Sequence, residues 1–313
     1  MKKIETKKIL QALVGSESNY SQQSIYPDSA GMDSPDLFMK GKYFSTEDIN
    51  SQIYLRNYEN SYRLGPISGT SEFMAHPENM VALFERRYRE EIDGAIMLPK
   101  PRILQAKLKY ALQTRVSSRN FNGKELSLQE LSDFLFYAAG TVKEEMMPLS
   151  KSGDAVTRYR RPFPSGGGMY ATELYLVIYH VKGITPAVYI YQSISHSLIK
   201  YAPVVALHHF VVTERYDRAS AAYVPIENFD PAVFICCVNN FNQQRLKYGE
   251  LSLALAYVDC GCLLQNCSLL AAVLGLEFCI WAGYKKAEAE NYLNIDGLDT
   301  HVIMTGLLGA GHG

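Results

Sequence analysis

The stretch that decides the fold covers residues 160–179 and reads RRPFPSGGGMYATELYLVIY. Three consecutive glycines, Gly166–Gly168, leave a short loop without side chains, so its backbone N–H groups can lie against a ligand. The β-branched and aromatic residues that follow predict a buried strand over 172–181. The spacing fits neither a G-x-G-x-x-G dinucleotide motif nor a phosphate loop, which favours a planar ligand resting on the loop. A mobile glycine loop is the alternative that these residues alone leave open.

A second basic cluster precedes this stretch and reads Arg115-Val116-Ser117-Ser118-Arg119. Two arginines with a serine between them can supply fork-shaped donors and a hydroxyl to one dianionic group. Downstream, a capping box at 127–130 and apolar residues at helical spacing predict a helix over 127–139. We therefore expect the cluster beside an ordered helix, although a solvated arginine-rich turn is the alternative.

Three motifs together resemble those of a known family. They are Arg115-x-Ser117-x-Arg119, the glycine loop running into Glu173-Leu174-Tyr175, and Trp281-Ala282-Gly283-Tyr284. In this order they resemble the FMN-dependent nitroreductase superfamily. Within it, the chain is similar to the azoline dehydrogenases of the SagB and McbC type, which act in the biosynthesis of thiazole- and oxazole-containing peptides. The resemblance covers roughly residues 111–308.

The resemblance implies an α+β, nitroreductase-like fold, in which helices flank a mixed, mostly antiparallel sheet. It also implies a homodimer whose two FMN sites are each built from both subunits. FMN is expected rather than FAD because the sequence has one cluster of phosphate donors and no adenine-dinucleotide fingerprint. The residues expected to bind FMN are Arg115, Ser117, Arg119, Pro164, Ser165, Gly166, Gly167, Gln265, Gly283 and Lys285.

Lys247 and Tyr248 stand just before a long apolar helical region. On composition alone they read as a solvated turn, but azoline dehydrogenases carry a Lys-Tyr pair at this place that is implicated in catalysis. Oxidising a thiazoline or oxazoline to its azole requires a base for the α-carbon proton, while the β-hydrogen leaves as hydride to the flavin. An ammonium lowers the pKa of a nearby phenol, which makes Tyr248 a base assisted by Lys247. The reverse assignment stays open.

The resemblance implies a place in the biosynthesis of a ribosomally made peptide of the bacteriocin or microcin type. The expected partners are a cyclodehydratase of the YcaO type, its leader-binding subunit and the precursor peptide. One alternative is an NAD(P)H-dependent nitro or quinone reductase of small molecules. Another is an FMN-binding scaffold subunit of a synthetase complex, since its binding motifs would look the same.

Composition narrows the function classes further. The 313 residues carry 31 basic and 32 acidic side chains, which argues against nucleic acid as a partner. No signal peptide is recognisable, and the longest apolar region, around 263–280, is too often interrupted by polar residues to span a bilayer, so we expect a cytoplasmic protein. The six cysteines lack C-x-x-C spacing and read as buried small hydrophobes, so no metal site is expected.

The chain divides by texture into an N-terminal extension, residues 1–110, and an FMN-binding domain, residues 111–313. The extension combines a tyrosine-rich irregular arm with helical patterns. In the domain, helices are predicted over 127–139 and 248–274, and an exposed loop over 147–158. The predicted strands are 172–181, 187–192, 198–202, 231–238, 276–284 and 300–308.

Overall fold

The computed structural model describes residues 76, 79, 81, 90–148, 155–217, 220 and 222–311. The tyrosine-rich arm predicted for the first 75 residues therefore lies outside the described residues. Contacts group the described chain into two units. One contains the antiparallel pair β7 (Glu214–Asp217) and β8 (Ala222–Pro225), and the other contains everything else described below.

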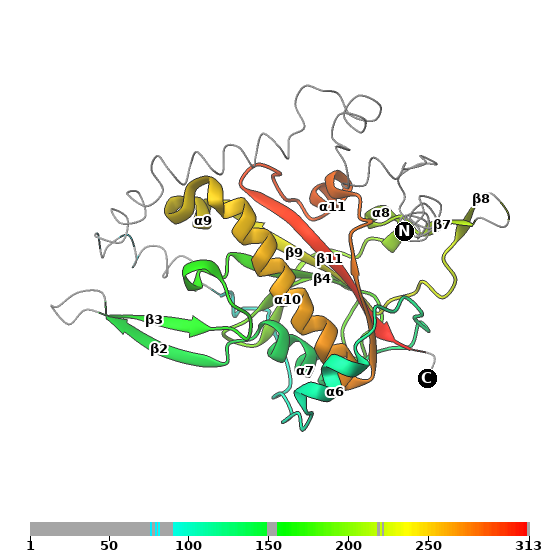
Figure 1. Ribbon diagram of the computed structural model, residues 1–313, viewed down its shortest axis with the longest axis horizontal. Helices are drawn as coiled ribbons and strands as arrows, with labels where there is room; N and C mark the ends of the chain where they lie inside the picture. Colours follow the sequence, from blue (N-terminus) through cyan, green and yellow to red (C-terminus); the bar gives the residue numbers. More distant parts are fainter. Residues whose placement is uncertain are drawn as a thin grey trace, which may run out of the picture. The chain divides into compact units, whose positions relative to one another are not determined.

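The larger unit is built on a seven-stranded sheet in the order β1-β6-β5-β4-β9-β11-β10, in which every neighbouring pair is antiparallel. Helices flank this sheet, so the predicted nitroreductase-like α+β fold is confirmed (Figure 1). The strands are β1 (Ile96–Met97), β4 (Thr172–Ile178), β5 (Ala187–Gln192), β6 (Ser197–Pro203), β9 (Val233–Asn240), β10 (Leu276–Trp281) and β11 (Thr300–Ala310).

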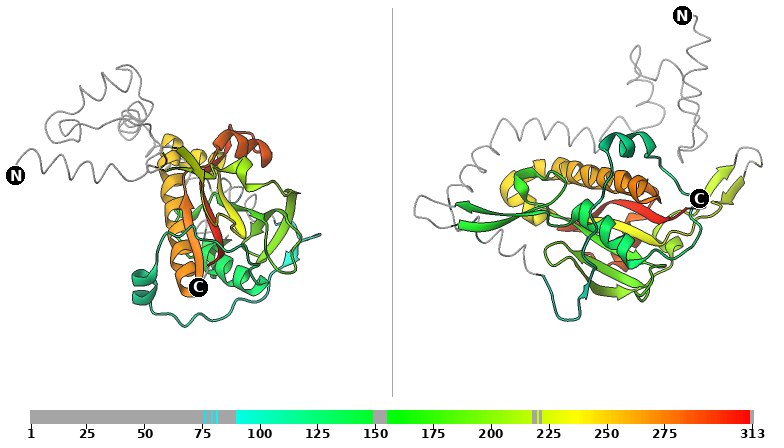
Figure 2. Two further views of the ribbon diagram at one scale, coloured as in Figure 1. Left: turned by 90° about the vertical axis from the view of Figure 1, so that its right-hand side faces the viewer. Right: turned by 90° about the horizontal axis from the view of Figure 1, so that it is seen from below.

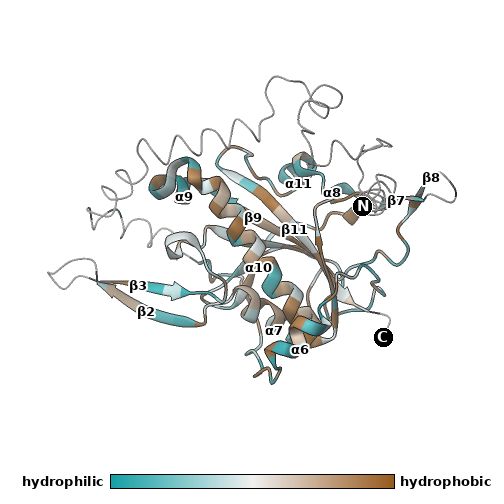
Figure 3. Cartoon of the chain, in the orientation of Figure 1, coloured by the Kyte–Doolittle hydropathy of each residue, from teal (hydrophilic) through white to brown (hydrophobic). Residues whose placement is uncertain are grey.

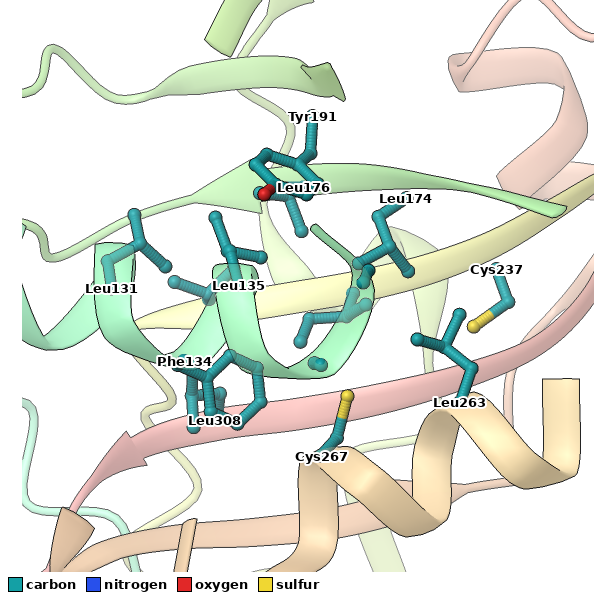
Figure 4. Close-up of a cluster of buried hydrophobic side chains, with 14 of the residues drawn as sticks. Leu131, Phe134, Leu135, Leu174, Leu176, Tyr191, Cys237, Leu263, Cys267 and Leu308 are labelled. Atoms are coloured by element: carbon teal, nitrogen blue, oxygen red, sulfur yellow. The ribbon is translucent and has the colours of Figure 1, made fainter. Parts of the chain in front are cut away.

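Alternation along the central strands divides the core between the two faces of the sheet. In β4, Leu174 and Leu176 belong to one buried cluster, whereas Tyr175 and Val177 belong to the other. This is the period of two that a strand imposes, and here both faces are covered. In the first cluster, shown in Figure 4, side chains of the two long helices meet those of the sheet.

Helices α7 (Leu128–Ala139) and α10 (Ser252–Leu274) cover the first face, and α10 runs along it in both views of Figure 2. The predicted capping box starts α7: the Ser127 hydroxyl accepts from the Glu130 N–H, and the Glu130 carboxylate accepts from the Ser127 N–H. Gly275, with φ 69°, ends α10 in the left-handed conformation. Short helices α8 (Leu207–Phe210) and α11 (Lys286–Tyr292) contribute to the second cluster, and α6 (Leu108–Thr114) contacts α10.

Two predicted segments differ from the structure. Of the loop predicted over 147–158, residues 147–148 belong to strand β2 (Lys143–Pro148) and residues 155–158 to strand β3 (Ala155–Arg160). These antiparallel strands form a ribbon that extends away from the sheet (Figures 1 and 2). The helix predicted over 248–274 is interrupted near its start. Helix α9 (Phe241–Tyr248) ends at Gly249, whose φ of 52° breaks the helix, and a short 3-10 turn leads into α10.

Helix α10 is apolar, but it packs as a core helix. The stretch 241–274 is long and apolar enough by length and composition to cross a membrane, yet Leu263, Leu264 and Cys267 pack against the sheet as in the core helix of a globular domain.

All six cysteines are free thiols, and five of them are buried. Burial raises the pKa of the Cys267 thiol to about 12, which keeps it protonated at neutral pH.

Candidate functional site

The glycine loop forms one tight turn immediately before β4. Gly166–Gly168 make a single 3-10 turn in which Gly167 and Gly168 have φ values of 62° and 64°. These are left-handed conformations that disfavour any residue with a Cβ. The Ser165 carbonyl accepts from the Gly168 N–H at 2.8 Å, and the following Tyr170 also has a positive φ, 44°. The loop therefore needs its glycines for backbone geometry as well as for space.

Lys247 and Tyr248, at the end of α9, point at this loop. A Cβ placed on Gly167 would lie 2.6 Å from the Tyr248 hydroxyl oxygen and 2.8 Å from Lys247 Nζ. The same ammonium lies 5.3 Å from the centroid of the Tyr248 ring. The fold thus brings together the predicted catalytic pair and the predicted ring-binding loop, which lie about 80 residues apart in the sequence.

The local environment shifts the pKa of Tyr248 in the direction opposite to that expected from the sequence. Burial, reinforced by the Asp259 carboxylate, raises the pKa of Tyr248. Burial, followed by the charge of Arg158, lowers the pKa of Lys247. Tyr248 was expected to have a lowered pKa because of the neighbouring ammonium, but loss of water around both groups acts in the other direction. Of the two residues, Lys247 therefore has the environment of a base and Tyr248 that of a hydrogen-bond donor.

The buried carboxylate of Asp259 anchors the loop to α10. Asp259, on α10, is 1% exposed, and its Oδ2 accepts from the Ser165 hydroxyl at 2.5 Å and from Gln244 Nε2 at 3.3 Å. The Ser165 oxygen in turn accepts from the Tyr170 N–H at 2.8 Å. This chain of bonds ties both ends of the glycine turn to α10, so the turn is preorganised. Ser165 is thus turned toward α10, whereas the neighbouring Pro164 is exposed.

A second cation reaches the loop from the ribbon. A Cβ on Gly168 would collide with the guanidinium of Arg158, on β3, and one on Gly166 would lie 3.0 Å from Leu255 Cδ1. The Nε of Arg158 is buried and has no hydrogen-bond partner among the described residues. All three glycines are therefore needed for close approach of neighbouring side chains.

The arginine segment lies beside a different strand. The Ser118 N–H donates to the Phe278 carbonyl of β10 at 3.0 Å, and Arg115 Nη1 donates to Ser117 Oγ at 3.4 Å. The Arg119 guanidinium lies 5.7 Å from the centroid of the Trp281 ring. Ser117 and Arg119 are exposed, and Arg115 is half-buried. The three predicted phosphate donors thus share one exposed segment at the sheet edge.

The other predicted cofactor residues fall in two places. Gly283 lies beside Trp281, since its Cβ would be 3.2 Å from the indole Nε1, and that Nε1 is buried without a partner among the described residues. Lys285 Nζ donates to the His208 carbonyl at 3.0 Å, away from the arginine segment. Gln265 is exposed on α10, ten residues beyond Leu255 and so roughly 15 Å further along the helix than the glycine loop.

Within one chain, the glycine loop and the arginine segment lie at distant places on the sheet. β9 and β11 stand between β4 and β10, which makes the separation across the sheet roughly 14 Å. The register places Thr172 level with Asn239 and His301, whereas Phe278 is level with Leu308, roughly 23 Å further along. The two halves of the predicted FMN site are thus separated diagonally in a single subunit.

Two residues of this region were absent from the predicted site. Asp259 could have been found, because it is the single charged residue in the apolar stretch 252–274. Arg158 had no comparable signal, since its place beside Gly168 depends on a ribbon that the sequence pattern did not predict. Among the described residues, no group of three or more His, Cys, Asp or Glu side chains could hold a metal ion.

Comparison with known proteins defines the class. The sequence model of the nitroreductase family matches residues 112–312, so the chain belongs to the nitroreductase family. Members of this family are oxidoreductases that bind flavin.

Two curated relatives are similar in sequence. Over 176 residues the chain is 28% identical to "Putative nitroreductase MJ1384" of Methanocaldococcus jannaschii, covering 56% of this chain and 78% of that protein. Over 141 residues it is 26% identical to the "Microcin B17-processing protein McbC" of Escherichia coli, covering 44% of this chain. The aligned region spans about half, 49%, of that protein's length.

The chain is also similar to solved structures. The crystal structure of a "putative nitroreductase" from Ralstonia eutropha JMP134 superposes with a TM-score of 0.53 at 19% identity, covering 70% of this chain and 90% of that one. The E. coli microcin synthetase McbBCD complex with truncated pro-MccB17 bound gives a TM-score of 0.48 at 20% identity, covering 74% and 82%.

Proposed function

We propose that this protein is an FMN-dependent azoline dehydrogenase, which oxidises thiazolines or oxazolines of a ribosomally made peptide to thiazoles or oxazoles. One observation carries the proposal: Lys247 Nζ and the Tyr248 hydroxyl converge on Gly167 of the glycine loop. A nitroreductase that only passes hydride from a nicotinamide to an acceptor needs no such proton-transfer pair. Removing two hydrogens from adjacent ring carbons does need one.

The residues present fit FMN. The glycine turn has no side chains of its own, and the indole Nε1 of Trp281, which has no hydrogen-bond partner among the described residues, lies beside the arginine segment. Arg115, Ser117 and Arg119 would hold the phosphate, and Pro164, Ser165, Gly166 and Gly167 would lie against the ring system. Gly283 supports the phosphate end, whereas Gln265 and Lys285 require the partner subunit or a side-chain movement to reach the cofactor. Bound FMN would accept the hydride at N5.

Lys247 and Tyr248 divide the proton chemistry between them. The lowered pKa of Lys247 makes its neutral amine accessible as the base for the α-carbon proton. The raised pKa of Tyr248 keeps its hydroxyl protonated, able to donate to the ring heteroatom or to the departing charge. The bonds from Ser165 and Gln244 to Asp259 keep this corner rigid while the substrate is bound.

The working unit in this proposal is a homodimer. Two observations support it: the diagonal separation of the two half-sites, and exposed apolar side chains on α10, whose ribbon is apolar over much of its length in Figure 3. On that face Tyr257 is 53% and Val258 57% exposed, and Gly261 and Gln265 follow at helical spacing. Exposed apolar side chains next to each other on a helix are typical of an interface. Pairing two copies there would bring the glycine loop of one toward the arginine segment of the other.

The sequence similarity to McbC supports a synthetase as the setting. We propose that a YcaO-type cyclodehydratase with its leader-binding subunit supplies the cyclised precursor peptide. The chemistry requires such a supplier, because the substrate rings are formed by loss of water from cysteine, serine or threonine before they can be oxidised.

Single-turnover flavin bleaching tests the proposal. Purified, FMN-loaded protein is mixed anaerobically with a thiazoline-containing peptide, and the flavin absorbance is followed while mass spectrometry measures loss of two hydrogens per ring. Bleaching together with that mass loss is expected. A protein that is not bleached by any cyclised peptide, yet is bleached rapidly by NAD(P)H, is a reductase instead.

The second candidate function is that reductase, which acts on small nitro compounds or quinones. The similarity to the M. jannaschii protein favours it. NAD(P)H oxidation coupled to a nitroaromatic or quinone acceptor measures it directly. Under this alternative, replacement of Lys247 or Tyr248 would leave turnover largely unchanged. If the protein binds FMN but neither peptide nor NAD(P)H bleaches it, the scaffold role remains.

A further inference from the structure

Arg158 is the strongest feature of the glycine-loop corner that the reaction described above leaves without a role. Its guanidinium lies against Gly168, one residue from the glycine that faces Lys247 and Tyr248. Its charge also contributes to lowering the pKa of Lys247, so the two cations are close. Two neighbouring cations on a loop of backbone N–H groups favour an anion or a developing negative charge between them.

In the ribbon, the acidic residue opposite Arg158 forms its ion pairs with other residues, so Arg158 is available to the glycine loop. Arg158 is the register partner of Glu145 across the ribbon. The Glu145 carboxylate, however, pairs with Lys143 at 2.7 Å and with Arg160 at 2.5 Å, one on each strand. Lys143 and Arg160 are solvent-exposed, whereas Arg158 is half-buried, and its buried Nε has no hydrogen-bond partner in the part of the chain that the structure describes. The acid that would neutralise Arg158 in an ordinary ribbon is therefore occupied.

The buried carboxylate of Asp259, on the other side of the loop, does not take the place of Glu145 as an ion-pair partner of Arg158. Asp259 Oδ2 accepts from the neutral Ser165 hydroxyl and Gln244 amide, and its charge acts on Tyr248. The corner thus combines two cations, Arg158 and Lys247, with one anion that is engaged below the loop. Arg158 therefore adds a positive charge beside the part of the loop that faces Lys247 and Tyr248.

We propose that Arg158 forms an oxyanion-binding subsite at the glycine loop, beside Lys247, which binds the carbonyl or carboxylate oxygen attached to the substrate's five-membered ring. The identity of the ligand rests on the proposed function. In that reaction the α-carbon–hydrogen bond breaks, the proton passes to the Lys247 amine, and the electron pair delocalises onto the adjoining carbonyl oxygen. The Arg158 guanidinium donates a charge-assisted hydrogen bond to this oxygen and stabilises the charge. The pair then returns as the β-hydrogen leaves as hydride to the flavin, so the ring loses one proton and one hydride.

Binding of a product-like anion tests the subsite without turnover. The probe is thiazole-4-carboxylate, a planar azole with an anionic oxygen on the reacting carbon. It is titrated into full-length, FMN-loaded protein and followed by calorimetry and by the flavin absorbance spectrum. The parent is expected to bind it. Arg158→Gln should weaken binding roughly tenfold to a hundredfold, the range for loss of one charge-assisted hydrogen-bonding partner.

Arg160→Gln is the matched control. It removes the same charge two residues along the same strand, on the same face of the ribbon, where Arg160 pairs with Glu145. It should leave probe affinity within about twofold of the parent, because Glu145 still pairs with Lys143 and exposed ion pairs contribute little. Arg158→Lys keeps the charge but loses the fork, so it should lie between the parent and Arg158→Gln. This variant decides the matter if the glutamine variant does not retain FMN.

Three outcomes would overturn the subsite: no probe binding to the parent, equal affinity in parent and Arg158→Gln, or equal weakening by Arg160→Gln. Failure of the proposed function looks different. If cyclised peptides do not bleach the flavin but probe binding depends on Arg158, the subsite stands and serves another conjugated carboxylate. If bleaching and ring oxidation proceed at the parental rate in Arg158→Gln, the dehydrogenase stands and Arg158 only packs against the loop.

Discussion

The two predicted halves of the flavin site are supported by the chain in different ways. At the glycine loop, a buried carboxylate, two cations and a phenol converge on four residues, Ser165 and the three glycines. At the arginine segment, Arg119 and Ser117 are exposed, and one backbone bond from Ser118 fixes them to β10. The first region is preorganised within one subunit, whereas the second presents its donors outward. This difference predicts that mutations at the loop change chemistry, while mutations at the arginine segment change only what is bound.

Replacing the pair on α9 should produce the largest effect. We expect Tyr248→Phe and Lys247→Ala each to slow single-turnover ring oxidation by roughly 10²- to 10⁴-fold, the usual contribution of a positioned proton-transfer group. FMN content should not change, because neither residue belongs to the phosphate-binding segment. Tyr137→Phe is the control: Tyr137 lies on α7, and its hydroxyl donates to the Arg102 carbonyl. Parental bleaching rates in both variants would remove the pair from the mechanism.

The exposed face of α10 offers a test of whether the two regions act across a dimer. Val258→Glu should give monomers that no longer retain FMN, because each chain then keeps only half of a site. Size-exclusion chromatography with light scattering and the ratio of flavin to protein absorbance measure the two effects. Leu298→Glu, at a side chain that is 75% exposed elsewhere, should change neither. A monomer with a full complement of FMN would mean that one chain holds the cofactor alone.

Alanine substitutions at Gly167 and at Gly183 compare the glycine loop with an ordinary turn. Gly183 also has a positive φ, 83°, but nothing lies within 4 Å of its absent Cβ. Both alanine variants should lose about 1–2 kcal/mol of unfolding free energy from the left-handed backbone. Gly167→Ala should in addition slow ring oxidation by about 100-fold, since its methyl group displaces the Tyr248 hydroxyl and Lys247 Nζ. Thermal melts and bleaching rates for both variants check this, and equal activity would contradict close approach at the loop.

Arg119→Ala should act on binding alone. Loss of one charge-assisted contact to phosphate should weaken FMN binding roughly tenfold to a hundredfold while the melting temperature of the flavin-free protein stays the same. Arg245→Ala is a suitable control because Arg245 stacks on Phe241 at 5.8 Å much as Arg119 stacks on Trp281 at 5.7 Å. Equal FMN affinity in both variants would make Arg119 an ordinary surface arginine.

The contrast between the regions also explains what the sequence could predict. The strand β5, the helix α7 with its capping box, and the end of α10 at Gly275 follow from local patterns, because alternation, caps and left-handed glycines are encoded within a few residues. The order of the motifs was enough to assign the fold. Lys247 and Tyr248 were placed with the glycine loop by resemblance, and the chain brings them together.

What the sequence did not predict depends on tertiary contacts. The ribbon β2–β3 is rich in charged residues and carries no apolar periodicity, so nothing local distinguishes it from a loop. The break at Gly249 is hidden because residues on both sides of it favour helix. The pKa direction of Tyr248 was wrong for the same reason, since burial and Asp259 outweigh the neighbouring ammonium, and neither can be read from adjacent residues. The predicted FMN contacts of Gln265 and Lys285 also depend on tertiary or subunit contacts, and they stay predictions.

The smallest effect should be a change in protonation at the loop itself. Asp259→Asn removes the negative charge that, after burial, raises the pKa of Tyr248, so Tyr248 should ionise at lower pH than in the parent. If its hydroxyl must be protonated for catalysis, the high-pH limb of the bleaching rate moves to lower pH with it. Ser165→Ala removes the hydrogen bond to Asp259 but keeps the charge, and should leave that pKa close to the parental value. Tyrosine-labelled NMR titrations, with the Tyr248 signal identified by its loss in Tyr248→Phe, measure the pKa in each variant. A parental pKa in Asp259→Asn would show that burial alone controls the phenol, and Asp259 would then serve only to anchor the glycine turn.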